Sequence, residues 1–219
     1  MKSKKINKKR KNKERTQQFL KLFVPSILAG IAISLGGFCF LSVENKLVGS
    51  ILFSVGLFLV CTRGYNLYTG KVCYCETKEN IKDLLFIILG NYLGTNITAL
   101  LLKCTRYADA LTTKATSIID LKLSDNLLSI FVLAIFCNIF IYIAVDGYKN
   151  SKNEIAKYLS IFFGVVCFIM TGTEHVVADM FYFAVAGNYT AKAFLILLIV
   201  FLGNTVGGRL YSFIEKYFS

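Results

Sequence analysis

The chain has 219 residues, of which 55% are hydrophobic and only 17% are charged, and its formal net charge is +12. Soluble domains carry about 25% charged residues, so this composition and the positive mean hydropathy of +0.59 are typical of a membrane protein and exclude a large soluble enzyme. The single histidine also excludes a zinc site built on several histidines.

The first predicted element is a basic tail over residues 1–21. Residues 1–24 contain ten Lys and Arg residues and one acid, Glu14. A basic stretch directly before an apolar run is typical of a cytoplasmic anchor that contacts anionic lipid, and we expect this role rather than nucleic-acid binding. The apolar run that follows is too long for a signal peptide and five more come after it, so we do not expect cleavage.

Six apolar segments follow the tail, and a bilayer-spanning helix needs about 20 such residues. The segments are 22–43, 47–67, 84–102, 127–145, 158–187 and 193–211. They predict a six-helix channel domain over residues 22–212, followed by a short C-terminal end at 213–219. With the N-terminus inside, eighteen Lys and Arg residues fall on the inner side and six on the outer side. The asymmetry predicts a multi-pass protein of the plasma membrane with both termini in the cytoplasm.

The second and fifth segments are interrupted by polar, glycine-containing stretches at 63–70 and 171–175. Such breaks survive at membrane depth only where protein or a water-filled cavity satisfies the freed backbone groups. The next segment in each half carries a Gly-Asn-x-x-Gly pattern, at Gly90-Asn91 and again at Gly203-Asn204. Because each half has three spans, the two copies run in opposite orientations. We therefore predict an all-α fold built as an inverted 3+3 repeat, with broken helices 2 and 5 meeting near the midplane.

Four motifs, in order and at matching spacing, resemble those of the formate/nitrite transporter family, whose members carry small monovalent anions. The motifs are Gly56-Leu57 with Leu67-Tyr68-Thr69-Gly70, then Lys122-Leu123-Ser124 with Cys137-Asn138, then Gly172-Thr173-Glu174-His175 through Met180, and finally Gly203-Asn204-Thr205-Val206-Gly207-Gly208. The resemblance runs over residues 23–211. It implies an aquaporin-like protomer that assembles as a homopentamer with one pore per protomer.

The resemblance also implies roles for individual residues. His175 is similar to the central pore histidine and Thr69 to the loop threonine, while Lys122 and Asn138 match the lysine and asparagine of the anion path. The apolar constrictions of the family fall on Phe53, Leu57, Leu67, Tyr68 and Phe168, with Ile141 one turn beyond Asn138.

The sequence departs from the family pattern at several positions. Asn66 stands where the family usually has an acid, and Asp179 stands where it usually has asparagine. The two changes look reciprocal, as if the acid and the asparagine of one hydrogen-bonded pair had changed places. Thr173 replaces a bulky phenylalanine. Arg63 is an unexpected cation, and we expect it to pair with Asp179 or Glu174 because a buried unpaired charge is very costly. We expect Glu174 to orient a neighbour or to cap a backbone donor.

These residues predict a channel or transporter for formate, nitrite or hydrosulfide, with protons as the second partner and no cofactor. An imidazole can donate a hydrogen bond or exchange a proton near neutral pH. Desolvation favours the neutral form of a small acid, so we expect the anion to cross the apolar constrictions as its conjugate acid.

Three other functions are weaker. An aquaporin-like pore for neutral solutes shares the architecture, but the two Asn-Pro-Ala boxes are absent and the only proline is Pro25. An intramembrane enzyme using Glu174 and His175 lacks a second histidine and a nucleophile pair, so we predict no catalytic residues. A membrane scaffold would not need polar breaks in two helices.

Overall fold

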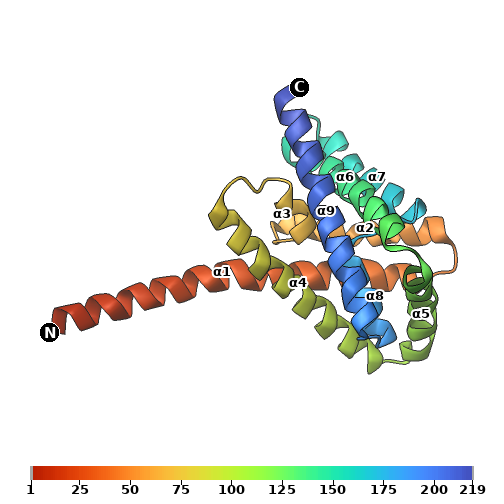
Figure 1. Ribbon diagram of the computed structural model, residues 1–219, viewed down its shortest axis with the longest axis horizontal. Coiled ribbons are helices and arrows are strands. Elements are labelled where there is room, and N and C mark those ends of the chain that lie inside the picture. The colour runs from red at the N-terminus through yellow and green to blue at the C-terminus, as the bar shows by residue number, and fades with distance from the viewer. Residues whose placement is uncertain (1, 219) are drawn as a thin grey trace.

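The computed structural model describes the backbone of residues 2–218 and the side chains of residues 14–218. Most of the basic tail therefore lies outside the described side chains. In the part of the chain that is described, the regular elements are all helices (Figure 1). They are α1 (Lys2–Leu41), α2 (Lys46–Arg63), α3 (Tyr68–Val72), α4 (Lys78–Lys103), α5 (Ala108–Ser124), α6 (Leu127–Asn150), α7 (Glu154–Met170), α8 (Val176–Ala186) and α9 (Ala191–Phe218).

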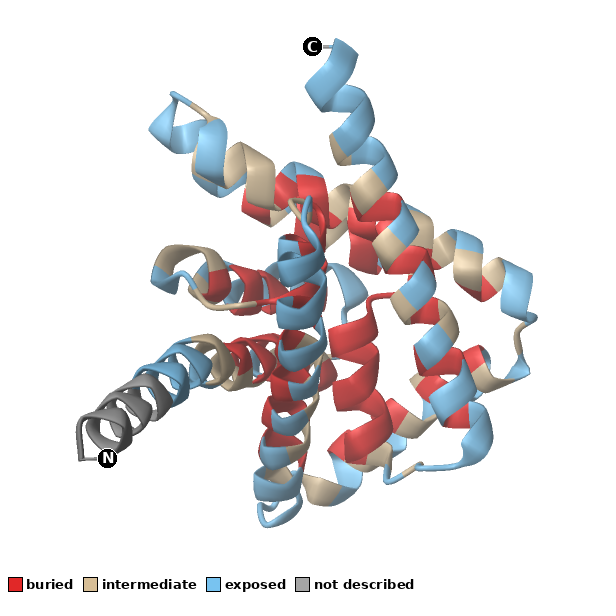
Figure 2. Cartoon of the chain, turned by 60° about the vertical axis from the view of Figure 1, so that its left-hand side comes forward, coloured by how far each residue is buried: buried red, intermediate tan, exposed pale blue. Residues whose placement is uncertain are grey.

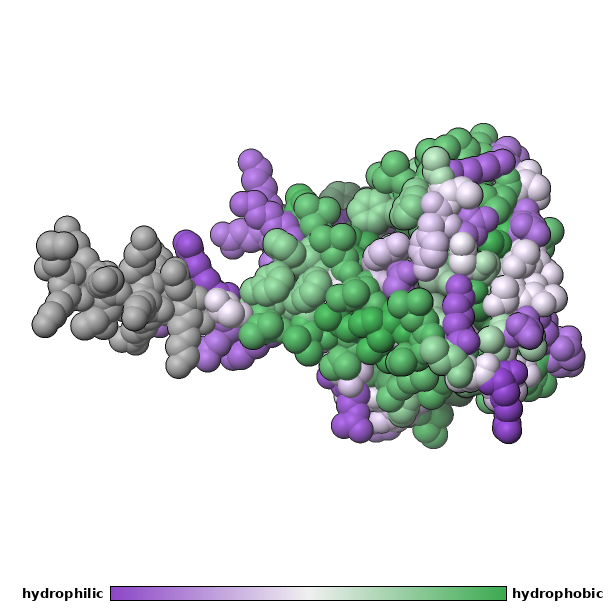
Figure 3. All heavy atoms as spheres, turned by 90° about the horizontal axis from the view of Figure 1, so that it is seen from below, coloured by the Kyte–Doolittle hydropathy of each residue, from purple (hydrophilic) through white to green (hydrophobic). Residues whose placement is uncertain are grey.

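Five helices, α1 from Glu14 onward, α2, α4, α6 and α9, are long and apolar enough to cross a membrane. The predicted segment over 158–187 is divided between α7 and α8. Apolar side chains cover much of the surface seen from below, and hydrophilic ones gather mainly towards its ends (Figure 3). A surface of this kind suits contact with lipid. The prediction of an all-helical, multi-pass membrane protein is therefore confirmed.

Helix α8 lies in the middle of the molecule. Its residues from Val176 to Val185 are all buried, as Figure 2 shows by the continuous red of this helix. Helices α1, α4, α5 and α9 pack against it, while α1 also packs on α2 and α4, and α6 packs on α7 and α9. A helix whose surface is apolar on nearly every side is buried among other helices. The break that precedes α8 is therefore held at the centre of the helical bundle.

Both predicted breaks are confirmed, and they have the same local geometry. A glycine with positive φ ends each preceding helix: Gly64 after α2 (φ 67°) and Gly172 after α7 (φ 68°). This left-handed conformation costs glycine little and other residues more. The next residue, Tyr65 or Thr173, donates its N–H back to the helix just ended. The first break is shorter than expected, because the residues from Tyr68 onward already belong to α3.

The asparagine of the first Gly-Asn-x-x-Gly motif fastens the first break. Asn91 Oδ1 accepts from the Tyr68 N–H at 2.9 Å, at the start of α3. Its amide Nδ2 donates to the Ser26 carbonyl at 2.7 Å and to the Asn66 carbonyl at 2.9 Å. One buried side chain thus joins α1, α3 and α4 and satisfies backbone groups that the break leaves open.

Asn204 fastens the second break in the same way. Its Oδ1 accepts from the Val176 N–H at 2.9 Å, and its Nδ2 donates to the Ala134 and Glu174 carbonyls, both at 2.8 Å. Val176, Ala134 and Glu174 each lie the same number of residues after Tyr68, Ser26 and Asn66, which are the corresponding partners of Asn91. The two halves are therefore built alike around their breaks.

The glycines of the two motifs allow the close helix packing that the sequence predicts. A Cβ atom added at Gly94 of α4 would lie 2.2 Å from the Ile27 carbonyl oxygen of α1. One added at Gly207 of α9 would lie 2.1 Å from the Ile135 carbonyl oxygen of α6. Since the obstacle is backbone in both cases, it has little room to move.

We expect Gly207→Ala to destabilise the protein by about 1–3 kcal/mol or more, the usual cost of overpacking. Gly70→Ala is the matched control, because a Cβ atom there would meet Val145 only at an ordinary 3.4 Å. Thermal unfolding of the purified variants in detergent measures both. Equal stability of the two variants would show that α9 and α6 can separate at no cost.

The region between α4 and α6 contains none of the six predicted apolar segments. It contains the 17-residue helix α5, which packs on α8. The buried residues of α5 are Leu111, Ala115, Ile119 and Lys122, which recur at helical spacing on one face. Lys122 consequently lies in the last turn of a helix and points into the protein.

Candidate functional site

His175 occupies the second break and caps the start of α8. Its Nδ1 atom accepts from the Ala178 N–H at 3.1 Å. Because Nδ1 is an acceptor, the neutral ring carries its proton on Nε2. That atom lies 3.0 Å from Thr69 Oγ1, so the imidazole donates to the threonine of α3. One hydrogen bond therefore links the two breaks, and both residues are buried.

Aromatic rings close the space beside this hydrogen bond. Phe168 of α7 stacks on the His175 ring with centroids 5.6 Å apart and planes 27° apart. Phe53 of α2 meets Phe168 edge-on, at 5.6 Å and 88°. Leu57, one turn further along α2, is buried as well. The structure therefore brings together His175, Thr69 and two of the predicted constriction rings.

A cavity of about 520 Å³ opens on one side of these rings. Phe168 and His175 form part of its wall, together with the charged residues Lys122, Glu174 and Asp179. Its other charged lining residues are Glu44, Lys46, Lys114 and Asp125. We call this space the outer cavity, following the predicted orientation of the chain.

A second cavity, of about 480 Å³, lies at the opposite ends of α2 and α7. Leu67 and Gly70 line it beside Lys71 of α3, Lys149 of α6 and Lys157 of α7. Burial and the neighbouring ammonium group of Lys149 lower the pKa of Lys71. We call this space the inner cavity. The two cavities flank the buried ring cluster, as the two ends of a pore would.

Lys122 is the centre of a buried charge cluster at the wall of the outer cavity. Its ammonium group is ion-paired with Glu174 and lies 3.0 Å from Asp179 Oδ1. Lys122, which the resemblance assigns to the anion path, is therefore buried and paired with two carboxylates. Glu174 contacts the Lys122 ammonium group, and its expected role in orienting a neighbour or capping a backbone donor stays a prediction.

The predicted pair of Arg63 with Asp179 or Glu174 is wrong. Both carboxylates are paired with Lys122, whereas Arg63 is exposed at the end of α2 beside the first break. The hydrogen-bonded pair suggested for Asn66 and Asp179 is also wrong. The Asn66 amide donates to the Leu22 carbonyl at 3.0 Å instead.

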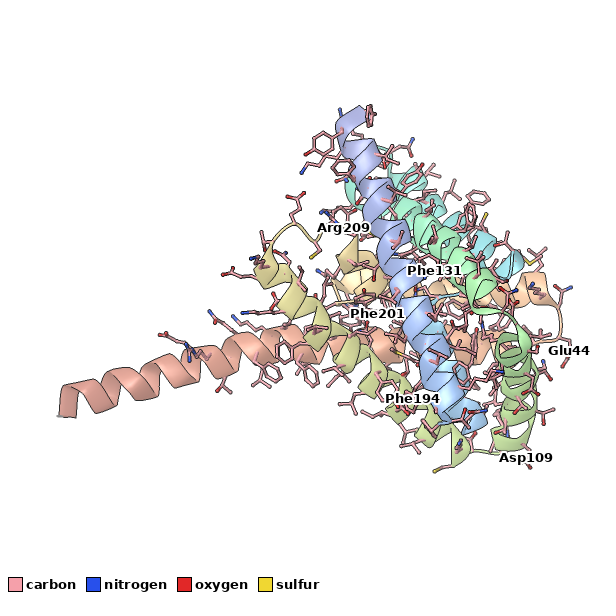
Figure 4. The ribbon with its side chains drawn as sticks, viewed as in Figure 1. Glu44, Asp109, Phe131, Phe194, Phe201 and Arg209 are labelled. Carbon is pink, nitrogen blue, oxygen red and sulfur yellow. The ribbon has the colours of Figure 1, made fainter. Side chains whose placement is uncertain are left out.

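The remaining predicted residues lie towards α9. The Tyr68 ring stacks on Phe201 with centroids 4.8 Å apart, and its hydroxyl is 2.6 Å from Thr205 Oγ1; Figure 4 labels Phe201 on α9, next to α3. Asn138 Nδ2 donates to the Asn204 carbonyl at 2.7 Å. Asn138 Oδ1 is buried without a partner among the described residues. Ile141 is buried on α6, one turn beyond Asn138.

The sequence does not predict that the Asn91 and Asn204 side chains hold the breaks, because their motifs by themselves indicate only a repeat. The available signal was their equivalent place in two copies of one motif, each following a polar break. Among the described residues, no group of three or more His, Cys, Asp and Glu side chains could hold a metal ion.

Comparisons with known proteins show similarity to formate transporters and channels. The family model described as formate/nitrite transporter matches residues 3–217. A probable formate transporter of Methanothermobacter thermautotrophicus is 30% identical over 87% of this chain and 85% of its own. The formate channel BtFdhC of Bacillus thuringiensis is 26% identical over 85% of this chain and 82% of its own. A solved pentameric formate channel with formate bound superposes with a TM-score of 0.82, covering 92% of this chain and 97% of that one, at 24% identity.

Proposed function

The chain belongs to the formate/nitrite transporter family, and from this premise we propose that it is a membrane channel or transporter for small monovalent weak-acid anions: formate, nitrite or hydrosulfide. We propose further that it has the six-span, aquaporin-like inverted repeat with α7 and α8 as one broken span. A homopentamer of the plasma membrane, with both termini in the cytoplasm, completes the proposal. The names of the similar formate channels and transporters support the substrate class.

One observation carries the proposal: a buried polar pair, His175 with Thr69, lies beside apolar rings between two cavities. Moving an unpaired anion from water into such surroundings costs several kcal/mol or more of free energy. The cost of moving a neutral weak acid is far smaller. The arrangement therefore favours passage of the substrate as its conjugate acid, with His175 or water supplying the proton.

The lining of the inner cavity suits the rest of the path. Lysines at a low-dielectric mouth raise the local concentration of anions, and this cavity carries Lys71, Lys149 and Lys157 against one acid, Glu154. At the rings, Thr69 can exchange its bond with His175 for one with the passing acid, since a hydroxyl both donates and accepts. Asn138 Oδ1, which is buried and has no partner within the described part of the chain, is a further acceptor close to α3.

Flux into proteoliposomes tests the proposed function. We expect formate, nitrite or hydrosulfide to enter faster at low pH, while chloride, whose conjugate acid is far too strong to form in the pore, stays outside. His175→Ala should reduce this flux at least about tenfold, because it removes the donor to Thr69 and the group that can exchange a proton. Glu44→Gln, which changes an exposed acid of the same cavity, is the control.

Two outcomes would contradict this proposal. Equal flux of all four anions at every pH would indicate an unselective channel. Absence of flux for each of them would favour the scaffold or enzyme instead.

A further inference from the structure

The charge cluster at the outer cavity contains two carboxylates and one ammonium group. The side chains of Lys122, Glu174 and Asp179 are 10%, 6% and 2% exposed. The two other lysines of the cavity are engaged elsewhere: Lys46 donates to the Met170 carbonyl at 3.1 Å, and Lys114 pairs with Glu44 at 2.7 Å. With every group ionised, the cluster would hold one uncompensated negative charge, which is costly away from water.

The contacts of Asp179 indicate how this charge is neutralised. Its Oδ2 atom is buried, and no donor among the described residues reaches it. Its other oxygen and the Glu174 carboxylate contact the same ammonium group, so the two carboxyl groups lie close together. Two ionised carboxylates can only accept hydrogen bonds, whereas a proton on one of the two removes the extra negative charge and supplies a donor.

Among the side chains that the structure describes, none brings a second positive charge to Asp179. Besides Lys122 of α5 and Glu174 of the break, Cys137 of α6 and Tyr182 of α8 interact with it, and a thiol and a phenol are neutral near pH 7. The His175 ring is neutral as well, because its Nδ1 accepts a backbone N–H. Lys103 of α4 lies beside Gly187, at the opposite end of α8.

We propose that Glu174 and Asp179 share one proton around the Lys122 ammonium group, and that this proton is delivered to the weak-acid anion in the outer cavity. The delivery step rests on the proposed function; the shared proton does not. Asp179 creates the arrangement, because asparagine at this position would leave one carboxylate balanced by one ammonium.

The step conserves atoms and charge. The O–H bond of the shared carboxylic acid breaks, and its electron pair stays on the carboxylate. A new bond to hydrogen forms on the anion, which continues past Phe168 as a neutral acid. A proton from water in the outer cavity then restores the carboxylic acid. On this route the cluster supplies the proton in place of His175, and His175 serves as the hydrogen-bond donor to Thr69.

Infrared spectroscopy of the purified protein tests the shared proton without any transport. A protonated carboxylic acid has a C=O stretching band that shifts in heavy water. We expect this band near pH 7 in the wild type and in Glu44→Gln. We expect it to be lost in both Asp179→Asn and Glu174→Gln, because either change leaves one carboxylate with one ammonium. Absence of the band in the wild type, or its survival in either cluster variant, would overturn the proposal.

Formate influx tests the delivery step. Near pH 7.5 we expect Asp179→Asn to lower the influx at least about tenfold, since it removes a proton donor. Near pH 5.5 the loss should be smaller, because the solution itself supplies more formic acid. Equal influx in the variant and the wild type at both pH values would overturn delivery from this cluster. If the wild type carries none of formate, nitrite and hydrosulfide, the proposed function fails, while the infrared band still decides whether the proton is shared.

Discussion

Lys122→Met is expected to destabilise the protein by about 3–5 kcal/mol, the usual cost of removing one partner from a buried ion pair. The substitution leaves Glu174 and Asp179 buried without the ammonium group that both contact. Protonation of the two carboxyl groups can offset part of this cost, so the loss should be larger at pH 8 than at pH 5. Thermal unfolding of the variant in detergent at both pH values measures it.

Two variants make the Lys122 experiment specific. The triple variant Lys122→Met, Glu174→Gln, Asp179→Asn removes all three charges, and we expect it to recover most of the lost stability. Lys114→Met is the matched control, because Lys114 pairs with the exposed Glu44 and such pairs contribute about 1 kcal/mol or less. If Lys114→Met lost as much stability as Lys122→Met, burial of the Lys122 cluster would not explain the loss.

The membrane spans and the two breaks could be predicted because both have local signatures. An apolar run of about 20 residues predicts a span wherever it packs. The breaks were visible because glycine and polar residues interrupt such runs, and Gly64 and Gly172 show the reason in their positive φ angles. His175 could be placed at the site for the same reason, since it belongs to the second break.

The ion pairs could not be predicted, because charge complementarity does not say which helix ends meet. Arg63 and Asp179 are opposite charges in broken segments, yet Arg63 ends exposed beside the first break. The true partner of Asp179 is on α5, a helix without a long apolar run. Its helical signal is the apolar stripe of Leu111, Ala115 and Ile119 at every fourth position, but so short a stripe does not have the length of a membrane span.

Asn204→Ala is expected to destabilise the protein by at least about 3 kcal/mol and to abolish anion flux. It removes the acceptor of the Val176 N–H and the donors to the Ala134 and Glu174 carbonyls. Each buried group left without a partner costs about 1–3 kcal/mol. Because Val176 begins α8 directly after His175, release of this turn also displaces the imidazole from Thr69. Thermal unfolding and proteoliposome flux measure the two effects.

Asn91→Ala distinguishes the loss of stability from the displacement of His175. Asn91 makes the equivalent three hydrogen bonds, but at the first break. We expect a similar loss of stability and a displacement of Thr69 rather than His175. Asn96→Ala is the control, because Asn96 lies half-buried on the same helix and bonds only to Tyr92 and Tyr189 among the described residues. If both break variants unfold like Asn96→Ala, the asparagines do not hold the breaks, and the position of His175 must depend on the rings around it.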